Sequence, residues 1–223
     1  MNLLKKIINL FQAYKSGPLS GLFWKTITAK KLDISKSLNP ADMSPCALII
    51  LQHNPHQIGG VEQESLKMAE WFFGHHPDLH VLMYYFEPLR RTTSLLTAQG
   101  SKVINLGYFE NSTEKNLEWI LNNYSIKIAV IEHLANHSLN YPAKLNERQI
   151  PTALFIHDFH YLYDKYHPKN FELSPTDEMK SWWQNIMQYN NLQVVFNSEF
   201  SRQKYSELLN QNFNPKSIIS YPL

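Results

Sequence analysis

The sequence predicts an α/β protein built on a doubly wound, mainly parallel β-sheet. From Pro45 onward, short apolar runs typical of strands alternate with longer segments that have the period of amphipathic helices. The first run, CALIILQ (46–52), is apolar throughout, as expected of a parallel strand covered on both faces. This alternation is typical of strand–helix–strand units, and therefore of a parallel sheet between two layers of helices.

The predicted elements follow one another in a regular order. Strand-like runs cover residues 46–52, 79–86, 102–106, 126–133, 152–158, 192–196 and 216–221. Helical patterns cover residues 61–74, 88–99, 113–123, 141–148, 175–189 and 198–210. Ser174 and Ser198 are suited to begin the last two helices, and Gly100 is suited to end the helix at 88–99. Right-handed crossovers would wind such a chain into one Rossmann-like domain over residues 45–223.

Residues 1–44 are predicted to be a separate, basic extension. The stretch MNLLKKIINLFQAY has helical period, with apolar residues on one face and lysines on the other. Residues 1–36 carry seven lysines against one acidic residue, Asp33, a net charge of +6; the remaining 14 basic and 18 acidic residues give −4. This pattern fits either contact with an anionic membrane surface or packing against the protein itself, and both remain open.

Composition excludes several classes of protein. A net charge of +2 over 223 residues argues against a nucleic-acid-binding protein, which would show a concentrated basic face. No apolar run approaches the roughly 18 residues of a membrane span, and Lys5 and Lys6 interrupt the one stretch that resembles an export leader. The single cysteine, Cys46, rules out a disulfide framework and is expected to be a buried, inert thiol. We therefore expect a cytoplasmic protein, in peripheral contact with the inner membrane face if the extension binds lipid.

Ligands of doubly wound sheets bind beyond the carboxyl ends of the strands, near the point where the strand order reverses. Gly59 and Gly60 lie there, between the strand at 46–52 and the helix at 61–74. Two residues without Cβ allow a ligand to approach main-chain N–H groups, and the helix N-terminus favours a phosphate. The alternative is a tight turn with no ligand. Glu62 suits the first helical turn in either case. The dinucleotide and P-loop fingerprints are absent from the sequence.

His157 and Asp158 end another apolar strand at the same predicted edge. An imidazole there can act as a base near neutral pH or bind a sugar hydroxyl, and Asp158 would orient it. Polar-tipped aromatic residues of the kind that pack against sugar rings follow directly: His160, Tyr161, Tyr163 and Tyr166. The spacing of His157, His160 and His167 matches no established zinc pattern, so we expect no metal and no cofactor.

Two further positions belong to this edge. Glu132 and His133 end the strand at 126–133, and they either join the site or simply face water. Ser198 follows the strand at 192–196, where it either caps the next helix or contacts a ligand. Three other histidines flank a proline turn at the opposite edge and are expected on the surface: His75, His76 and His80.

Four motifs in this order resemble the N-terminal domain of GT-B glycosyltransferases of the family 4 type, over residues 46–221. They are HNPHQIGGVEQESLKMAEWF, IAVIEHLANHS, PTALFIHDFH and VVFNSEFSRQKYSELL. The resemblance implies a metal-independent enzyme that transfers a sugar from a nucleotide-sugar donor to a lipid or polysaccharide acceptor.

The resemblance also implies roles for matched residues. Gly59 and Gly60 would lie beside the donor diphosphate, and His157, or else His133, would contact the transferred sugar or the acceptor. Glu62 matches the acidic position after the glycines, without an assigned task. Ser198 matches the serine at the start of the last helix.

The sequence departs from that family at its end. The family's second Rossmann-like domain, which holds most of the nucleotide, would begin near SIISYPL, where this sequence stops. We expect a fragment, a truncated gene product or half of a two-chain enzyme, with little or no catalysis by this half alone. The alternatives are a non-catalytic binding or scaffold domain that retains the fold, and an unrelated Rossmann-like enzyme for another phosphate-bearing ligand.

Overall fold

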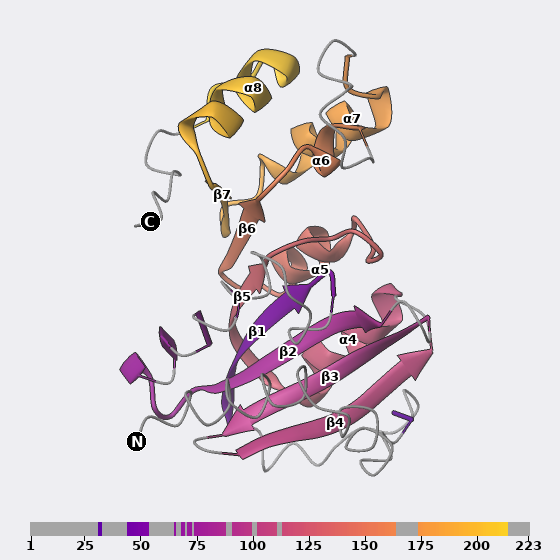
Figure 1. Cartoon of the computed structure of the whole chain (residues 1–223), viewed down its shortest axis with the longest axis vertical. Helices are drawn as coiled ribbons and strands as arrows, with labels where there is room; N and C mark the ends of the chain where they lie inside the picture. Colours follow the sequence, from indigo (N-terminus) through magenta and orange to yellow (C-terminus); the bar gives the residue numbers. More distant parts are fainter. Residues whose placement is uncertain are drawn as a thin grey trace, which may run out of the picture.

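A seven-stranded sheet in the order β4-β3-β2-β1-β5-β6-β7 forms the centre of the molecule (Figure 1). The computed structural model describes residues 31–32, 44–53, 65, 68–69, 71–72, 74–87, 91–99, 102–110, 113–163 and 174–213. The strands are β1 (Pro45–Leu51), β2 (His80–Glu87), β3 (Thr92–Gln99), β4 (Lys102–Glu110), β5 (Ser125–Ile131), β6 (Thr152–Ile156) and β7 (Leu192–Phe196). The helices are α4 (Glu114–Asn123), α5 (Tyr141–Glu147), α6 (His160–Tyr163), α7 (Asp177–Ile186) and α8 (Glu199–Leu209).

Five neighbouring strands, β2-β1-β5-β6-β7, are parallel. This confirms the prediction of an α/β protein with a mainly parallel sheet. The chain passes from β1 to β2 on one side, whereas β5, β6 and β7 are added on the other side of β1. The strand order therefore reverses between β1 and β5, which is the place where sheets of this kind bind ligands.

The prediction of a helix over residues 88–99 is wrong. Thr92–Gln99 forms β3, which pairs antiparallel with both β2 and β4. Leu95 packs into the core on one face of the sheet and Leu96 into the core on the other. Periodicity cannot separate strand from helix in so short an apolar run, and the β-branched threonines at 92, 93 and 97 favour a strand that has two partners.

The strand predicted at 102–106 extends to Glu110, so residues 107–110 also belong to β4. β4 is antiparallel to β3 and thus runs in the direction of β1, so its carboxyl end still lies at the same edge. Part of the predicted extension contacts this strand: the Leu32 N–H donates to the Tyr108 carbonyl (2.8 Å), and Lys31 Nζ lies 2.6 Å from a Glu110 carboxylate oxygen. The helix predicted at 1–14 and the strand at 216–221 lie outside the described residues.

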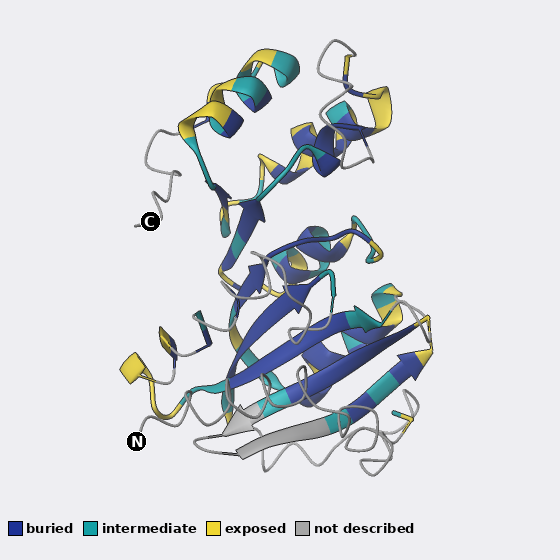
Figure 2. Ribbon diagram, in the orientation of Figure 1, coloured by how far each residue is buried: buried dark blue, intermediate teal, exposed yellow. Residues whose placement is uncertain are grey.

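Each face of the sheet buries its own core, and the strands are largely inaccessible to solvent (Figure 2). Alternate residues of β1 point to opposite faces: Leu48 and Ile50 join the core beneath α4 to α8, whereas Ile49 joins the core with Ala69 and Phe72. The described residues among 65–75 are helical, so helices cover both faces. Cys46 is buried, as predicted, and burial raises the pKa of its thiol to about 11.

The part of the core under α7 and α8 is built from aromatic rings. The Trp183 side chain is fully buried, donates from Nε1 to the Tyr161 carbonyl (2.9 Å), and packs edge-on against Tyr205 and Phe213. Such rings contribute strongly because they bury large apolar areas and their geometry is specific. No helix among the described residues has the length and apolar character needed to cross a membrane.

We predict that Trp183→Ala lowers the free energy of unfolding by about 3–5 kcal/mol, because it leaves a cavity and removes the hydrogen bond to the Tyr161 carbonyl. Urea denaturation followed by circular dichroism measures the change. Met187→Ala, at the exposed end of the same helix, is the matched control and should change stability by less than about 0.5 kcal/mol. A loss below about 1 kcal/mol for Trp183→Ala would contradict this account of the core.

Candidate functional site

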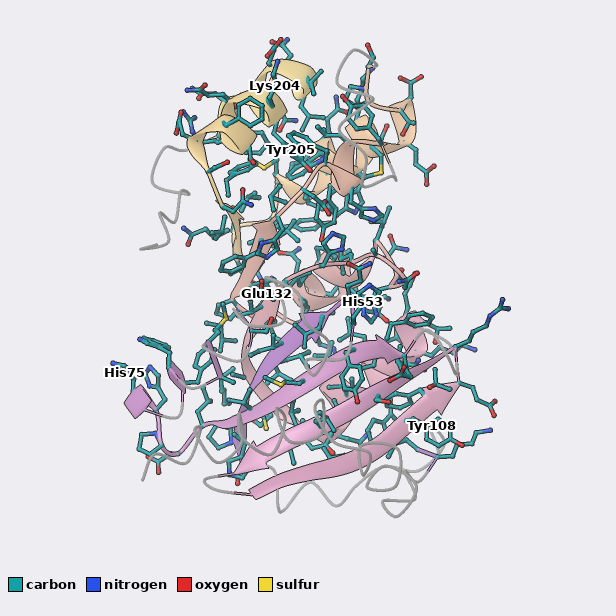
Figure 3. All side chains as sticks on the ribbon, viewed as in Figure 1. His53, His75, Tyr108, Glu132, Lys204 and Tyr205 are labelled. Carbon is teal, nitrogen blue, oxygen red and sulfur yellow. The ribbon has the colours of Figure 1, made fainter. Side chains whose placement is uncertain are left out.

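Two adjacent strands end in a pair of ionisable residues each. Glu132 and His133 follow β5, and His157 and Asp158 follow β6. β5 and β6 are parallel neighbours, so their carboxyl ends meet at one edge of the sheet. Glu132, labelled in Figure 3, continues the pairing of β5 with β1, since its N–H donates to the Ile50 carbonyl (2.9 Å).

The first contact joins His157 and Glu132. His157 Nε2 lies 2.7 Å from Glu132 Oε2, with the glutamate side chain fully buried and the imidazole 10% exposed. The His157 ring also stacks on Phe155, whose side chain belongs to the same face of the sheet as Val130. This pair therefore lies on the face of the sheet where Ala69 and Phe72 join the core.

The second contact joins His133 and Asp158 on the opposite face. His133 Nε2 lies 3.1 Å from Asp158 Oδ2, with the histidine 2% and the aspartate 29% exposed. The His133 ring packs beside Tyr161, which belongs to the core beneath α4 to α8. In both contacts one partner is buried and the other, His157 or Asp158, is accessible.

These crossed pairs correct the prediction that Asp158 orients His157. Successive residues of extended chain point to opposite faces of a sheet, so His157 and Asp158 diverge although they are adjacent in sequence. Each meets the residue after β5 that points to the same face, which is Glu132 for His157 and His133 for Asp158. Glu132 and His133 do not face water, as one alternative had it, because both are buried.

The proton on His133 has a defined position. The Ala135 N–H donates to His133 Nδ1 at 3.0 Å. A backbone N–H can only donate, so Nδ1 carries a lone pair and the proton is on Nε2. His133 is therefore a neutral imidazole that donates from Nε2 to Asp158.

Asp158 is an ionised acceptor. Its second oxygen, Oδ1, accepts from the His160 N–H at 2.8 Å. Burial raises the pKa of Asp158, but the hydrogen bonds from His133 and His160 outweigh that effect and leave the pKa below its usual value. Asp158 is thus charged at neutral pH.

β7 and α8 hold the main chain of the site in place. Asn197, directly after β7, donates from Nδ2 to the His157 carbonyl (3.0 Å). The buried Tyr205 hydroxyl on α8, labelled in Figure 3, donates to the Asp158 carbonyl (2.8 Å). Both accessible side chains therefore project from a segment that is fixed on two sides.

The aromatic residues after Asp158 do not form the accessible surface that we predicted. His160, Tyr161 and Tyr163 lie in the short helix α6 and are all buried. The Tyr161 hydroxyl accepts a hydrogen bond from the Leu134 N–H at 2.8 Å, so this polar group is bonded to the main chain. The segment is part of the core, and Tyr166 and His167 lie outside the described residues.

Ser198 is the N-cap of α8, where its Oγ accepts from the Ser201 N–H at 3.1 Å. This is one of the two roles we predicted for it.

Gly59, Gly60 and Glu62 lie outside the described residues. His75 and His76 are exposed, as predicted, and His75 lies well away from Glu132 in Figure 3. Across the described part of the chain, no group of three His, Cys, Asp or Glu side chains has a metal-binding arrangement.

Sequence reasoning missed the role of Glu132 as the partner of His157, and it missed His137. Two strands ending in Glu-His and His-Asp were the available signal for the first. The His137 Nε2–H donates to the Leu51 carbonyl at 2.6 Å and so ties the loop after β5 to the end of β1. Burial lowers the pKa of His137 to about 4, with His53 and His133 acting in the same direction.

The fold and site together define an α/β protein with two imidazole–carboxylate pairs at the carboxyl edge of its sheet. Comparison with protein-family models, with curated proteins and with solved structures finds no match for this chain. The chemistry of the site therefore has to come from its own geometry.

We predict that His137 makes the protein less stable in acid. The unfolded histidine titrates near 6.5 and the folded one near 4, so the unfolded chain binds the proton first as the pH falls. This contribution is complete above pH 6.5 and is lost between pH 6.5 and 4, by about 3 kcal/mol. Urea denaturation at pH 7 and at pH 4 measures how far the unfolding free energy falls in acid. This fall should be about 3 kcal/mol smaller in His137→Gln than in the wild-type protein. Equal falls in both proteins would refute the assignment.

Proposed function

We propose that this chain is the acceptor-side half of a GT-B glycosyltransferase, with a Rossmann-like fold. Together with a second domain that grips the nucleotide, it transfers a sugar from a nucleotide-sugar donor to a lipid or polysaccharide acceptor. The seven-stranded, mainly parallel sheet and the four sequence motifs support this class of enzyme.

One observation carries the proposal. The crossed pairs lie beside the reversal of strand order, and each presents one accessible polar side chain, His157 or Asp158. A sugar site needs convergent polar groups held by a rigid frame at such an edge. Asn197, Tyr205 and the buried partners provide that frame.

The proposed reaction uses these residues as follows. The acceptor oxygen forms a bond to the anomeric carbon, and the bond from that carbon to the donor diphosphate breaks. His157, held by Glu132, takes the proton of the acceptor hydroxyl as general base, and Asp158 binds a sugar hydroxyl. Gly59 and Gly60, which the sequence places before a predicted helix, would bind the diphosphate through main-chain N–H groups.

The basic extension gives the proposal a location. Its seven lysines and apolar stripe suit the inner, anionic face of a membrane, where lipid acceptors lie. The protein then works at the membrane surface as a peripheral component.

We predict that sugar transfer depends on His157. The chain is isolated from its own cells with whatever second domain it is joined or bound to, and it is incubated with radiolabelled UDP- and GDP-sugars and membranes. His157→Ala should lower transfer about 100-fold or more, as expected for loss of a general base. His75→Ala, an exposed histidine at the opposite edge, is the matched control and should leave transfer unchanged.

Two results would contradict the proposal. Transfer that persists in His157→Ala would remove His157 from the reaction. Absence of transfer with every donor, in a preparation that still binds sugars, would favour a non-catalytic binding domain.

A further inference from the structure

We propose that the edge formed by β5 and β6 is an anion-excluding subsite for sugar hydroxyls, in which His133 is a positioning residue that keeps Asp158 an ionised acceptor. The inference rests on the proposed function in that it assigns the sugar, and not the donor diphosphate, to this edge. The geometry of the four side chains carries it.

The first step is the charge of the site. His133 is neutral because its Nδ1 accepts from Ala135, so the His133–Asp158 pair carries −1. The Glu132–His157 pair carries 0 if the imidazole is protonated and −1 if it is not. The four side chains together therefore carry −1 or −2, whatever the state of His157. Phosphate sites need the opposite, an excess of cationic or N–H donors.

Helix α8, the element next to these four side chains, does not offset their negative charge. α8 begins beside the site, but Glu199 occupies its first turn and Ser198 caps it. The guanidinium of Arg202 is engaged by Glu199 and by the Phe213 carbonyl. Neither the helix N-terminus nor this arginine is arranged to receive a phosphate.

The second step is the hydrogen-bonding capacity of Asp158. An ionised carboxylate offers about four lone-pair sites. His133 uses one site on Oδ2 and His160 one site on Oδ1, while the side chain stays 29% exposed. Acceptors of this kind select ligands that donate, which sugar hydroxyls do and a fully ionised diphosphate does not.

The third step concerns His133, which is too deeply buried to touch a ligand. Its ring could face Asp158 with either a proton or a lone pair, and a lone pair would repel the carboxylate. The Ala135 N–H removes that ambiguity, so His133 always presents Nε2–H. Its influence on the ligand therefore passes through Asp158.

The test uses the full chain and NMR of its backbone amides and histidine rings. The probes are the methyl glycosides of glucose, galactose, mannose and N-acetylglucosamine, each compared with inorganic pyrophosphate at the same millimolar concentration. We expect at least one glycoside to shift the resonances of residues 157–160, and pyrophosphate to leave them in place. The ¹⁵N shifts of His133 should report a proton on Nε2 and none on Nδ1.

Variants separate binding from folding. Asp158→Asn, which replaces the carboxylate by an amide of the same shape, should weaken glycoside binding about 10-fold, the usual effect of losing a charged hydrogen bond. His133→Phe should do the same, whereas His133→Gln, which can still donate to Asp158, should bind within about threefold of the wild type. An unchanged Trp183 indole signal shows that each variant is folded.

Three results would overturn the inference: a pyrophosphate-induced shift at residues 157–160, no shift with any glycoside, or a proton on His133 Nδ1. These results are distinct from failure of the transferase proposal. Transfer together with pyrophosphate bound at this edge would refute only the subsite. Glycoside binding without transfer would refute only the enzyme.

Discussion

The parallel pairing of β5 with β1 on one side and with β6 on the other is the constraint on which the site depends. It brings the ends of both strands to one edge, and the alternation of side chains then assigns Glu132 and His157 to one face and His133 and Asp158 to the other. A shift of one residue in this register would exchange the faces and break both pairs. The site is therefore a consequence of the sheet, with α8 holding its main chain from one side.

Glu132 is a fully buried ionisable side chain, and its Oε2 lies 2.7 Å from His157 Nε2. A buried charge without a partner costs several kcal/mol, and a buried pair gains little over well-packed apolar residues. An aliphatic residue after Ile131 would continue the core of β5 at no such cost. Ionisable side chains that break a local packing rule in this way are concentrated at functional sites. On the function that we propose, the buried Glu132 would hold the His157 imidazole in place.

Much of the fold could be predicted from the sequence, because β1, β6 and β7 are apolar runs bounded by polar residues. β3 could not, since its short run fits a helix equally well until β2 and β4 provide partners on both sides. The crossed pairs were missed for a related reason: adjacency in sequence suggests that Asp158 orients His157, whereas the alternation of faces separates them. The burial of Tyr161 was also hidden, because its hydroxyl accepts a hydrogen bond from the Leu134 N–H, which the sequence does not reveal.

Both pairs have the same construction, in which a buried residue after β5 contacts an accessible residue after β6. His133 holds Asp158 as an acceptor, and Glu132 holds His157 by its Nε2. In the subsite that we propose, the negative charge of this edge favours the sugar, whereas the diphosphate would bind at Gly59 and Gly60. A nucleotide-sugar combines a strongly anionic part with a neutral, hydroxyl-rich part. A sheet edge that is negative at β5 and β6 would orient such a ligand by repelling its anionic part and by accepting hydrogen bonds from its hydroxyl groups.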